Sequence, residues 1–190
     1  KNVMHKSLRW LEQTGTRGWC GYSFSWAACI YAKAKEGDNA AKMLTIFANN
    51  FVSANSFHLN GDQRGGQYSN FTYRPFTLEG NFAFAQGVHE MLLQSNNGYI
   101  EIFPAIPAMW KDVAFKTLRA EGAYLVSAIK ENGTATEVKI TAEAGGLLQL
   151  KLPFKTFVMA GGKKQYELCE NILKIKLTKG ETVIFKNGFE

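Results

Sequence analysis

Apolar residues in the first hundred positions recur every three to four residues, the spacing of one helix face. The first stretch, residues 1–14, ends at Gly15, where a helix would stop. Residues 23–35 (SFSWAACIYAKAK) are rich in alanine and carry aromatic residues on almost all sides, so they predict a buried helix. Residues 39–51 and 81–94 repeat the helical spacing. The pattern therefore predicts four helices, of which the second and third form a helix-turn-helix pair.

Residues 53–78 interrupt the helical pattern. They show no period and contain three glycines and several Asn, Ser and Gln residues, which predicts a long loop. Loops of this length in compact domains are usually functional or disordered. Disorder is the weaker interpretation because the loop holds five aromatic residues: Phe57, Tyr68, Phe71, Tyr73 and Phe76.

Beyond Pro104 and Pro107 the apolar spacing falls to about two, which is typical of strands. Short runs rich in Val, Ile and Leu alternate with Gly-containing turns and predict strands at residues 125–130, 137–142, 147–152, 171–177 and 182–186. The simplest arrangement is an antiparallel β-sandwich. The predicted fold class is thus α+β in two parts, helical over residues 1–103 and β over residues 104–190. Because so few helices cannot bury these apolar faces among themselves, we expect further helices before Lys1 in the complete protein.

Charge is spread evenly along the 190 residues. The net charge is +6, from nine basic and six acidic residues up to position 100 and thirteen and ten beyond it. A nucleic-acid surface would gather its basic residues, so we expect no nucleic-acid partner. No apolar run reaches the roughly 18 to 20 residues of a membrane span, and the first residues lack the apolar core of a signal peptide.

Several enzyme motifs are nearly present, and each lacks a residue that its chemistry requires. His89 and Glu90 begin an H-E-x-x-H zinc motif, but Leu93 stands where the second histidine belongs. Residues 21–25 resemble a nucleophile elbow until Ser25 replaces its last glycine, so Ser23 is expected to cap the N-terminus of a helix instead. Three cysteines show no metal-ligand spacing. We therefore expect no metal site and no cofactor.

Carboxylates and aromatic residues near the loop are the residue types that sugar hydrolysis uses: two carboxyl groups for acid and base, and flat apolar faces for the ring. The candidates are Asp62, in the Gly-rich loop, and Glu79, where the loop enters a helix. A helix N-terminus favours an ionised carboxylate, the form a general base needs. An ordinary acidic residue that stabilises its helix would occupy the same place. Asp62 is expected to be a turn residue.

Several stretches together resemble one enzyme family. Residues 18–26 (GWCGYSFSW), 76–81 (FTLEGN) and 90–95 (EMLLQS), followed by 102–107 (IFPAIP) and Trp110, resemble the C-terminal part of glycoside hydrolase family 95. Members of that family are α-L-fucosidases, with some α-L-galactosidases. The order and spacing hold from about Arg17 to Ala128. The resemblance implies that residues 1–103 are the last helices and active-site loop of an incomplete (α/α)₆ catalytic barrel and residues 104–190 a C-terminal β-sandwich domain.

The resemblance also implies an activity. It predicts an inverting hydrolase that removes terminal α-L-fucose, or a related sugar such as α-L-galactose, from glycans without a cofactor. Its substrate would be an oligosaccharide or glycoconjugate. Because complex glycans lie outside the cytoplasm, we expect the parent protein to be periplasmic or secreted.

The family's motif places the candidate site residues. Glu79 falls at the position of the general base, an aspartate in a Phe-Gln-Ile-Asp-Gly-Asn stretch, and adds one methylene. Tyr73 and Arg74 stand where the family has a histidine and a proline. Trp19, Tyr73, Arg74 and Asn81 are the expected substrate-binding residues. Trp26, inside an apolar helix, is expected in the core.

The catalytic acid lies, in the family, on earlier helices that this chain does not contain. We therefore expect the missing N-terminal part of the same protein to complete the site, and the 190-residue chain alone to be inactive. The alternative is a non-catalytic carbohydrate-binding or scaffold protein on the same fold, in which Glu79 only hydrogen-bonds a sugar. A carboxyl group roughly 6.5 to 9.5 Å across from Glu79 would favour the hydrolase.

Overall fold

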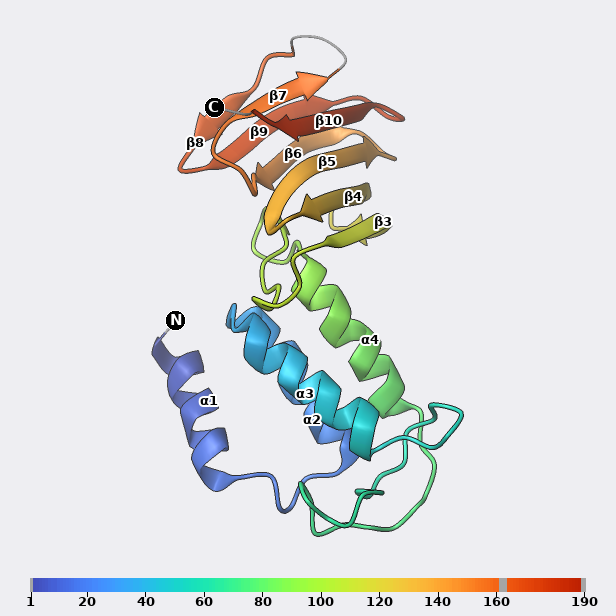
Figure 1. Cartoon of the computed structure of the whole chain (residues 1–190). Coiled ribbons are helices and arrows are strands. Elements are labelled where there is room, and N and C mark those ends of the chain that lie inside the picture. The colour runs from blue at the N-terminus through green and yellow to red at the C-terminus, as the bar shows by residue number, and fades with distance from the viewer. Residues whose placement is uncertain (1, 161–163, 189–190) are drawn as a thin grey trace. The chain divides into compact units, whose positions relative to one another are not determined.

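The computed structural model describes residues 2–160 and 164–188, which form four helices followed by ten strands (Figure 1). The chain divides into two compact units. The helical unit takes the residues up to Met91 and also Ala105–Pro107, and the β unit takes Leu92–Pro104 and the residues from Ala108 onward. The α+β fold class predicted from the sequence is confirmed.

The helical unit contains α1 (Asn2–Thr14), α2 (Gly21–Lys33), α3 (Gly37–Asn50) and α4 (Glu79–Leu92). Each helix lies within two residues of a predicted one. The apolar rings of Phe24 and Phe51 meet at 4.8 Å, centroid to centroid, and both side chains are fully buried. An ion pair of 2.7 Å between Lys33 and Glu90 joins α2 to α4. These contacts join α2 to the end of α3 and to α4.

Two expectations about α2 are wrong. The residue at the N-cap is Cys20, which makes no side-chain capping hydrogen bond, and Ser23 lies inside the first turn. Trp26, expected in the core, is 42% exposed. The buried side of α2 is formed by Phe24, Ala28 and Tyr31 instead, because Trp26 lies outside the face that these residues share.

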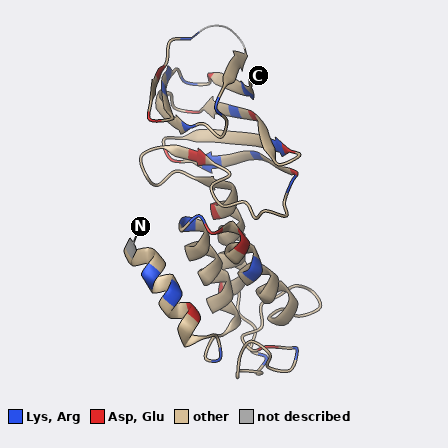
Figure 2. Ribbon diagram, turned by 60° about the vertical axis from the view of Figure 1, so that its left-hand side comes forward, with Lys and Arg blue, Asp and Glu red and all other residues tan. Residues whose placement is uncertain are grey.

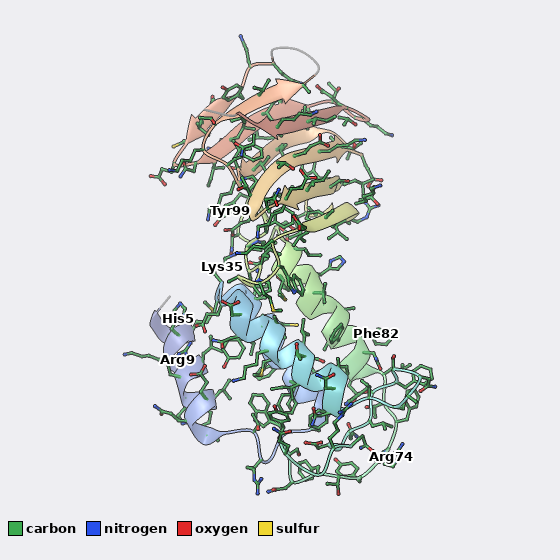
Figure 3. All side chains as sticks on the ribbon, viewed as in Figure 1. His5, Arg9, Lys35, Arg74, Phe82 and Tyr99 are labelled. Carbon is green, nitrogen blue, oxygen red and sulfur yellow. The ribbon has the colours of Figure 1, made fainter. Side chains whose placement is uncertain are left out.

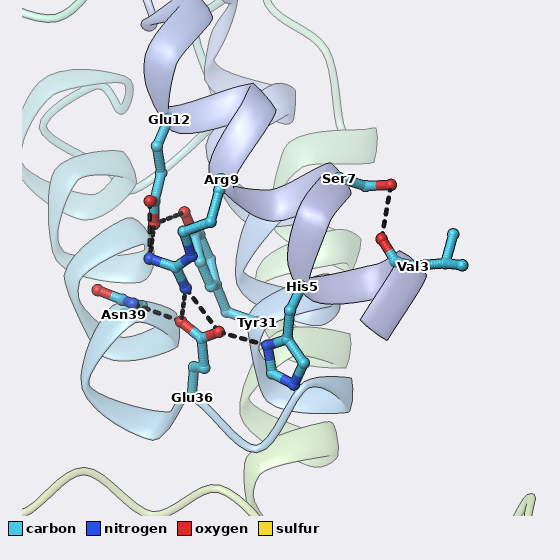
Figure 4. A network of polar contacts seen from close by, with 8 residues as sticks. All are labelled: Val3, His5, Ser7, Arg9, Glu12, Tyr31, Glu36 and Asn39. Carbon is cyan, nitrogen blue, oxygen red and sulfur yellow. Dashed lines mark hydrogen bonds and ion pairs between the residues drawn. The ribbon is translucent and has the colours of Figure 1, made fainter. Parts of the chain in front are cut away.

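A polar network attaches α1 to the rest of the helical unit (Figure 4). Arg9 donates to both carboxylate oxygens of Glu12 at 2.7–2.8 Å and to both of Glu36 at 2.6–2.7 Å. The Tyr31 hydroxyl donates to Glu12, and burial together with that bond raises the pKa of Tyr31 to about 12. Leu8 adds a buried apolar contact. Helix α1 is therefore held by one buried leucine and a mostly exposed set of charges.

The β unit holds ten strands among the described residues. They are β1 (Leu93–Gln94), β2 (Ile100–Ile102), β3 (Val113–Ala120), β4 (Tyr124–Glu131), β5 (Thr134–Ala142), β6 (Gly146–Lys151), β7 (Phe157–Ala160), β8 (Glu167–Cys169), β9 (Ile172–Leu177) and β10 (Thr182–Asn187). One sheet has the order β1-β2-β6-β9-β8 and the other β3-β4-β5-β10-β7. All pairings are antiparallel except that of β2 with β6, which is parallel.

The two sheets share one apolar core, as a β-sandwich requires. Buried side chains of the core come from both sheets, among them Val126, Val138, Ile140 and Phe185 from one, and Leu148, Leu150, Leu173 and Ile175 from the other. Lys and Arg lie among Asp and Glu along the strands rather than gathering on one of them (Figure 2). In the part of the chain that the structure describes, no helix combines the length and apolar character that crossing a bilayer demands.

Candidate active-site end of the helical unit

The long loop between α3 and α4 folds back on itself. Its two arms are joined by backbone hydrogen bonds in which the N–H groups of Asn60, Gly61 and Asp62 donate to Pro75, Tyr73 and Phe71 at 3.2, 2.9 and 2.7 Å. An isolated β-bridge between Leu59 and Phe76 continues this pairing of the two arms. Tyr73 and Arg74 are therefore carried on an arm whose backbone has a defined partner.

The loop is also attached to the start of α2. The Gly21 N–H donates to the Asn60 carbonyl at 3.0 Å, and the Ser69 hydroxyl donates to the Trp19 carbonyl at 2.5 Å. The Asn70 N–H donates to the Arg17 carbonyl at 2.8 Å. Figure 1 shows the loop at the end of the helical unit where α2 and α4 begin and α3 ends. This end brings together every site residue that the sequence predicts.

Glu79 is the first residue of α4, and its side chain is exposed. The positive end of the helix dipole favours the ionised carboxylate there. An exposed, ionised carboxylate is chemically able to accept a proton from a water molecule. The sequence predicted an acidic residue where the loop enters a helix, and Glu79 lies at that place. The role of Glu79 as a general base stays a prediction.

Asn81 lies two residues beyond Glu79 in α4, and its side chain is hydrogen-bonded to the loop. Its Oδ1 accepts from the His58 N–H at 2.8 Å, and its Nδ2 donates to the Ser56 carbonyl at 2.8 Å. The Asn81 side chain therefore fixes the loop backbone next to Glu79. A role in contacting substrate stays a prediction.

His58 is a residue that the sequence analysis did not select. It is fully buried, its Nδ1 lies 2.8 Å from the Thr77 hydroxyl in a hydrogen bond, and its ring packs 5.3 Å from that of Phe47. Burial lowers the pKa of His58 below its ordinary value, and the Glu79 carboxylate opposes that shift without cancelling it. His58 is therefore neutral near pH 7. The sequence signal was faint, because a lone histidine in a polar loop gives no hint of its burial.

Trp19, Tyr73 and Arg74 have different surroundings. Trp19 is half-buried, with its ring edge-on to Phe24 at 5.2 Å. Tyr73 is 46% exposed and meets the Phe71 ring at 5.6 Å. Arg74 is exposed and donates to the Gln63 side chain at 2.8 Å; Figure 3 shows it on the loop. Tyr73 thus offers an open aromatic face and Arg74 additional donors.

Asp62 organises the loop from inside, which confirms that it is a turn residue. It is 1% exposed and accepts from the N–H groups of Arg64 and Tyr68 and from the Asn50 side chain at 2.8–3.1 Å. Burial by itself would raise the pKa of Asp62, but these hydrogen bonds outweigh burial and hold the pKa below its ordinary value. Because both carboxylate oxygens accept hydrogen bonds from the loop and from Asn50, Asp62 stabilises the fold of the loop.

Comparison with known proteins identifies the family. Residues 2–92 match the glycosyl hydrolase family 95 catalytic domain, and residues 94–185 match the glycoside hydrolase family 95 C-terminal domain. The chain belongs to glycoside hydrolase family 95. The resemblance found in the sequence is confirmed, and the two family 95 domains meet where α4 ends and β1 begins.

A curated relative in family 95 is Alpha-L-fucosidase 2 from Arabidopsis thaliana. It is 33% identical over 136 residues, which cover 70% of this chain and 16% of the relative. The chain therefore spans 16% of the length of the relative it matches. Within the family's catalytic-domain match lie all five predicted site residues: Trp19, Tyr73, Arg74, Glu79 and Asn81.

The described residues of the family 95 chain hold no cluster of metal ligands, and Cys29 is not a reactive thiol. Across residues 2–160 and 164–188, no three His, Cys, Asp or Glu side chains gather as a metal site would require. The Cys29 thiol donates to the Ser25 carbonyl at 3.4 Å, and burial raises its pKa to about 11. Cys29 is therefore a structural thiol, because the thiolate is the reactive form.

Proposed function

We propose that the full-length protein containing this chain is an inverting glycoside hydrolase that removes terminal α-L-fucose, or a related sugar such as α-L-galactose, from glycans. Membership of family 95 and the similarity to Alpha-L-fucosidase 2 support the reaction class. The observation that carries the proposal is Glu79, an exposed carboxylate at the N-terminus of α4 inside the catalytic-domain match. A protein acting on such glycans would be periplasmic or secreted.

In this proposal Glu79 is the general base. It takes a proton from the water that attacks the sugar carbon, while a carboxylic acid outside this chain protonates the leaving oxygen from the opposite face. The two groups must lie roughly 6.5 to 9.5 Å apart to leave room for the water. Glu79 reaches about 1.5 Å further than the aspartate of the family motif, so the water and sugar would sit correspondingly further from the start of α4.

The neighbouring residues would form part of the sugar subsite. Aromatic faces of Trp19 and Tyr73 can lie against the apolar side of a sugar ring. Arg74 can donate hydrogen bonds to sugar hydroxyls. Asn81, whose amide holds the loop beside Glu79, would act on the substrate through that loop.

Replacing Glu79 in the full-length protein tests the proposal. Glu79→Gln keeps the size of the side chain and removes its charge, so kcat on an aryl α-L-fucoside or α-L-galactoside should fall by roughly 10² to 10⁴ with little change in KM. Glu167→Gln, which alters an exposed carboxylate of the β unit, is the matched control. An unchanged kcat together with a loss of a few tenths of a kcal/mol in stability would show that Glu79 only stabilises its helix.

Two further measurements separate the proposal from the non-catalytic alternative. Glu79→Asp should also lose rate, because the shortened carboxylate retreats from the water it must hold. Proton NMR of the first product formed should show the anomer of inverted configuration. Sugar binding without turnover by the wild-type protein would instead favour a carbohydrate-binding or scaffold protein.

A further inference from the structure

His58 combines complete burial with an unused polar atom. Its side chain is 0% exposed, and its Nε2 is one of the buried nitrogen and oxygen atoms of the described residues that have no hydrogen-bond partner. Leaving such an atom unpaired destabilises the folded state. The contacts made by the rest of the imidazole ring therefore have to account for the burial of His58.

The imidazole ring lies between the starts of two helices. A Cβ atom on Gly21, the first residue of α2, would come within 2.4 Å of His58 Nε2. A Cβ atom on Gly80, the second residue of α4, would come within 2.5 Å of His58 Nδ1. Only glycine leaves room for the ring at either position. His58 therefore contacts the backbone of both helices where they begin.

The contacts of the Thr77 hydroxyl favour the proton on His58 Nδ1. The Thr77 hydroxyl can donate to Asn60 Oδ1, 3.4 Å away, so it is left to accept from His58 Nδ1–H at 2.8 Å. Nε2 then presents a lone pair to the N-terminus of α2, where the positive end of the helix dipole stabilises it. A hydrogen on Nε2 would face the same helix end without an acceptor.

We propose that His58, as the neutral Nδ1–H tautomer, is a positioning residue for Glu79. Its contacts fall on both sides of that residue: Thr77 precedes Glu79 by two positions, and Gly80 and Asn81 follow it. The first turn of α4 is thereby fixed while the Glu79 side chain stays exposed. The inference rests on the proposed function of Glu79 as a base.

The tautomer is tested by NMR of the full-length protein labelled with ¹⁵N at histidine. The His58 signals are identified by their loss in His58→Asn. We expect the Nδ1–H pattern at pH 7, disturbed in Thr77→Val, kept in Thr77→Ser and unchanged in the control His89→Gln, which alters an exposed residue of α4. An Nε2–H or doubly protonated ring, or a Thr77→Val spectrum like the wild type, would overturn the proposal.

Positioning is tested by two readouts on the same variants. Thr77→Val should lower kcat roughly 10- to 100-fold at nearly constant KM, since small displacements of a catalytic group have effects of that size, and Thr77→Ser should restore it. Wild-type kcat per folded molecule in Thr77→Val would overturn positioning. The ¹³C chemical shift of the Glu79 carboxyl group at pH 7 should also change in Thr77→Val, and an unchanged shift would contradict the proposal. Because the NMR readouts need no turnover, failure of the proposed function is distinguishable from failure of the His58 proposal.

Discussion

Two buried polar side chains of the loop, Asp62 and His58, are stabilised in different ways. Asp62 accepts hydrogen bonds from two backbone N–H groups and from Asn50, so its charge is fully compensated. His58 is neutral and uses one ring nitrogen. A buried charge needs such compensation, whereas a neutral ring tolerates one unpaired atom. The loop thus has one charged buried residue, Asp62, and one neutral buried residue, His58, which contacts the first turn of α4.

Substitution of Asp62 should therefore destabilise the helical unit in a pH-dependent way. Asp62→Asn replaces an acceptor with an amide donor that faces N–H groups, and we expect a loss of about 2 to 3 kcal/mol in the free energy of unfolding at pH 7. The folded pKa of Asp62 is lowered, so its contribution is present above the unfolded pKa near 4 and is lost as pH falls through the folded pKa.

Urea unfolding of the wild type and of Asp62→Asn between pH 2 and pH 7 measures this difference. The two stability curves should converge as the pH falls through the folded pKa of Asp62. Glu167→Gln, an exposed change in the β unit, should leave the wild-type curve in place. A gap between wild type and Asp62→Asn that is constant with pH would contradict the assignment of the effect to the carboxylate charge.

At the scale of the element, Gly80 and Gly87 of α4 have different surroundings, so replacing each with alanine should have different effects on stability. Alanine is intrinsically better than glycine inside a helix by about 1 kcal/mol. At Gly80 the added Cβ would clash with the His58 ring. Gly80→Ala should therefore lower the free energy of unfolding by about 1 to 3 kcal/mol, despite the better helix propensity of alanine. At Gly87 the nearest atom is the flexible end of Leu44, 3.1 Å away, so Gly87→Ala should change stability by less than about 1 kcal/mol.

Thermal or urea unfolding of the two alanine variants gives the comparison directly. Equal stability changes would show that helix propensity, rather than the space taken by His58, determines the outcome. A stable Gly80→Ala protein would also remove the steric basis for the position of the ring.

Helix α1 depends on a single buried apolar side chain, and its substitution measures how strongly the helix is attached. Leu8 is 1% exposed, and Leu8→Ala should cost about 2 to 5 kcal/mol through lost burial and the remaining cavity. Val3→Ala, at a position 78% exposed, is the control and should have little effect. If hydrogen exchange of α1 is the same in both variants, the polar network around Arg9 holds the helix instead.

At the scale of the whole molecule, the active site that we propose is incomplete in this chain. The base position and its supporting loop lie in the helical unit, but no residue here is assigned as the catalytic acid. We therefore expect no turnover of an aryl α-L-fucoside by the 190-residue chain, because protonation of the leaving oxygen is missing. Hydrolysis above the buffer rate would overturn the assignment of the acid to the rest of the protein.

Local sequence determined most of the secondary structure of both units. Helical periodicity located α2, α3 and α4 because each helix buries one face, and alternation located β4, β5, β6, β9 and β10. The sequence missed β1, β2, β7 and β8, which have two to four residues each, and β3, whose register shifts between Phe115 and Leu118. Short or irregular strands carry too few alternating positions to be recognised.

The order and spacing of several short stretches, among them the one around Glu79, indicated the family from the sequence. What only the tertiary structure decided depends on partners that are distant along the chain. Burial of His58 requires glycines 37 residues before it and 22 after it, and the parallel pairing of β2 with β6 joins segments about fifty residues apart. The exposure of Trp26 likewise depends on which face of α2 its neighbours cover. Periodicity reports the side of an element that is apolar, whereas contacts between distant segments decide what that side meets.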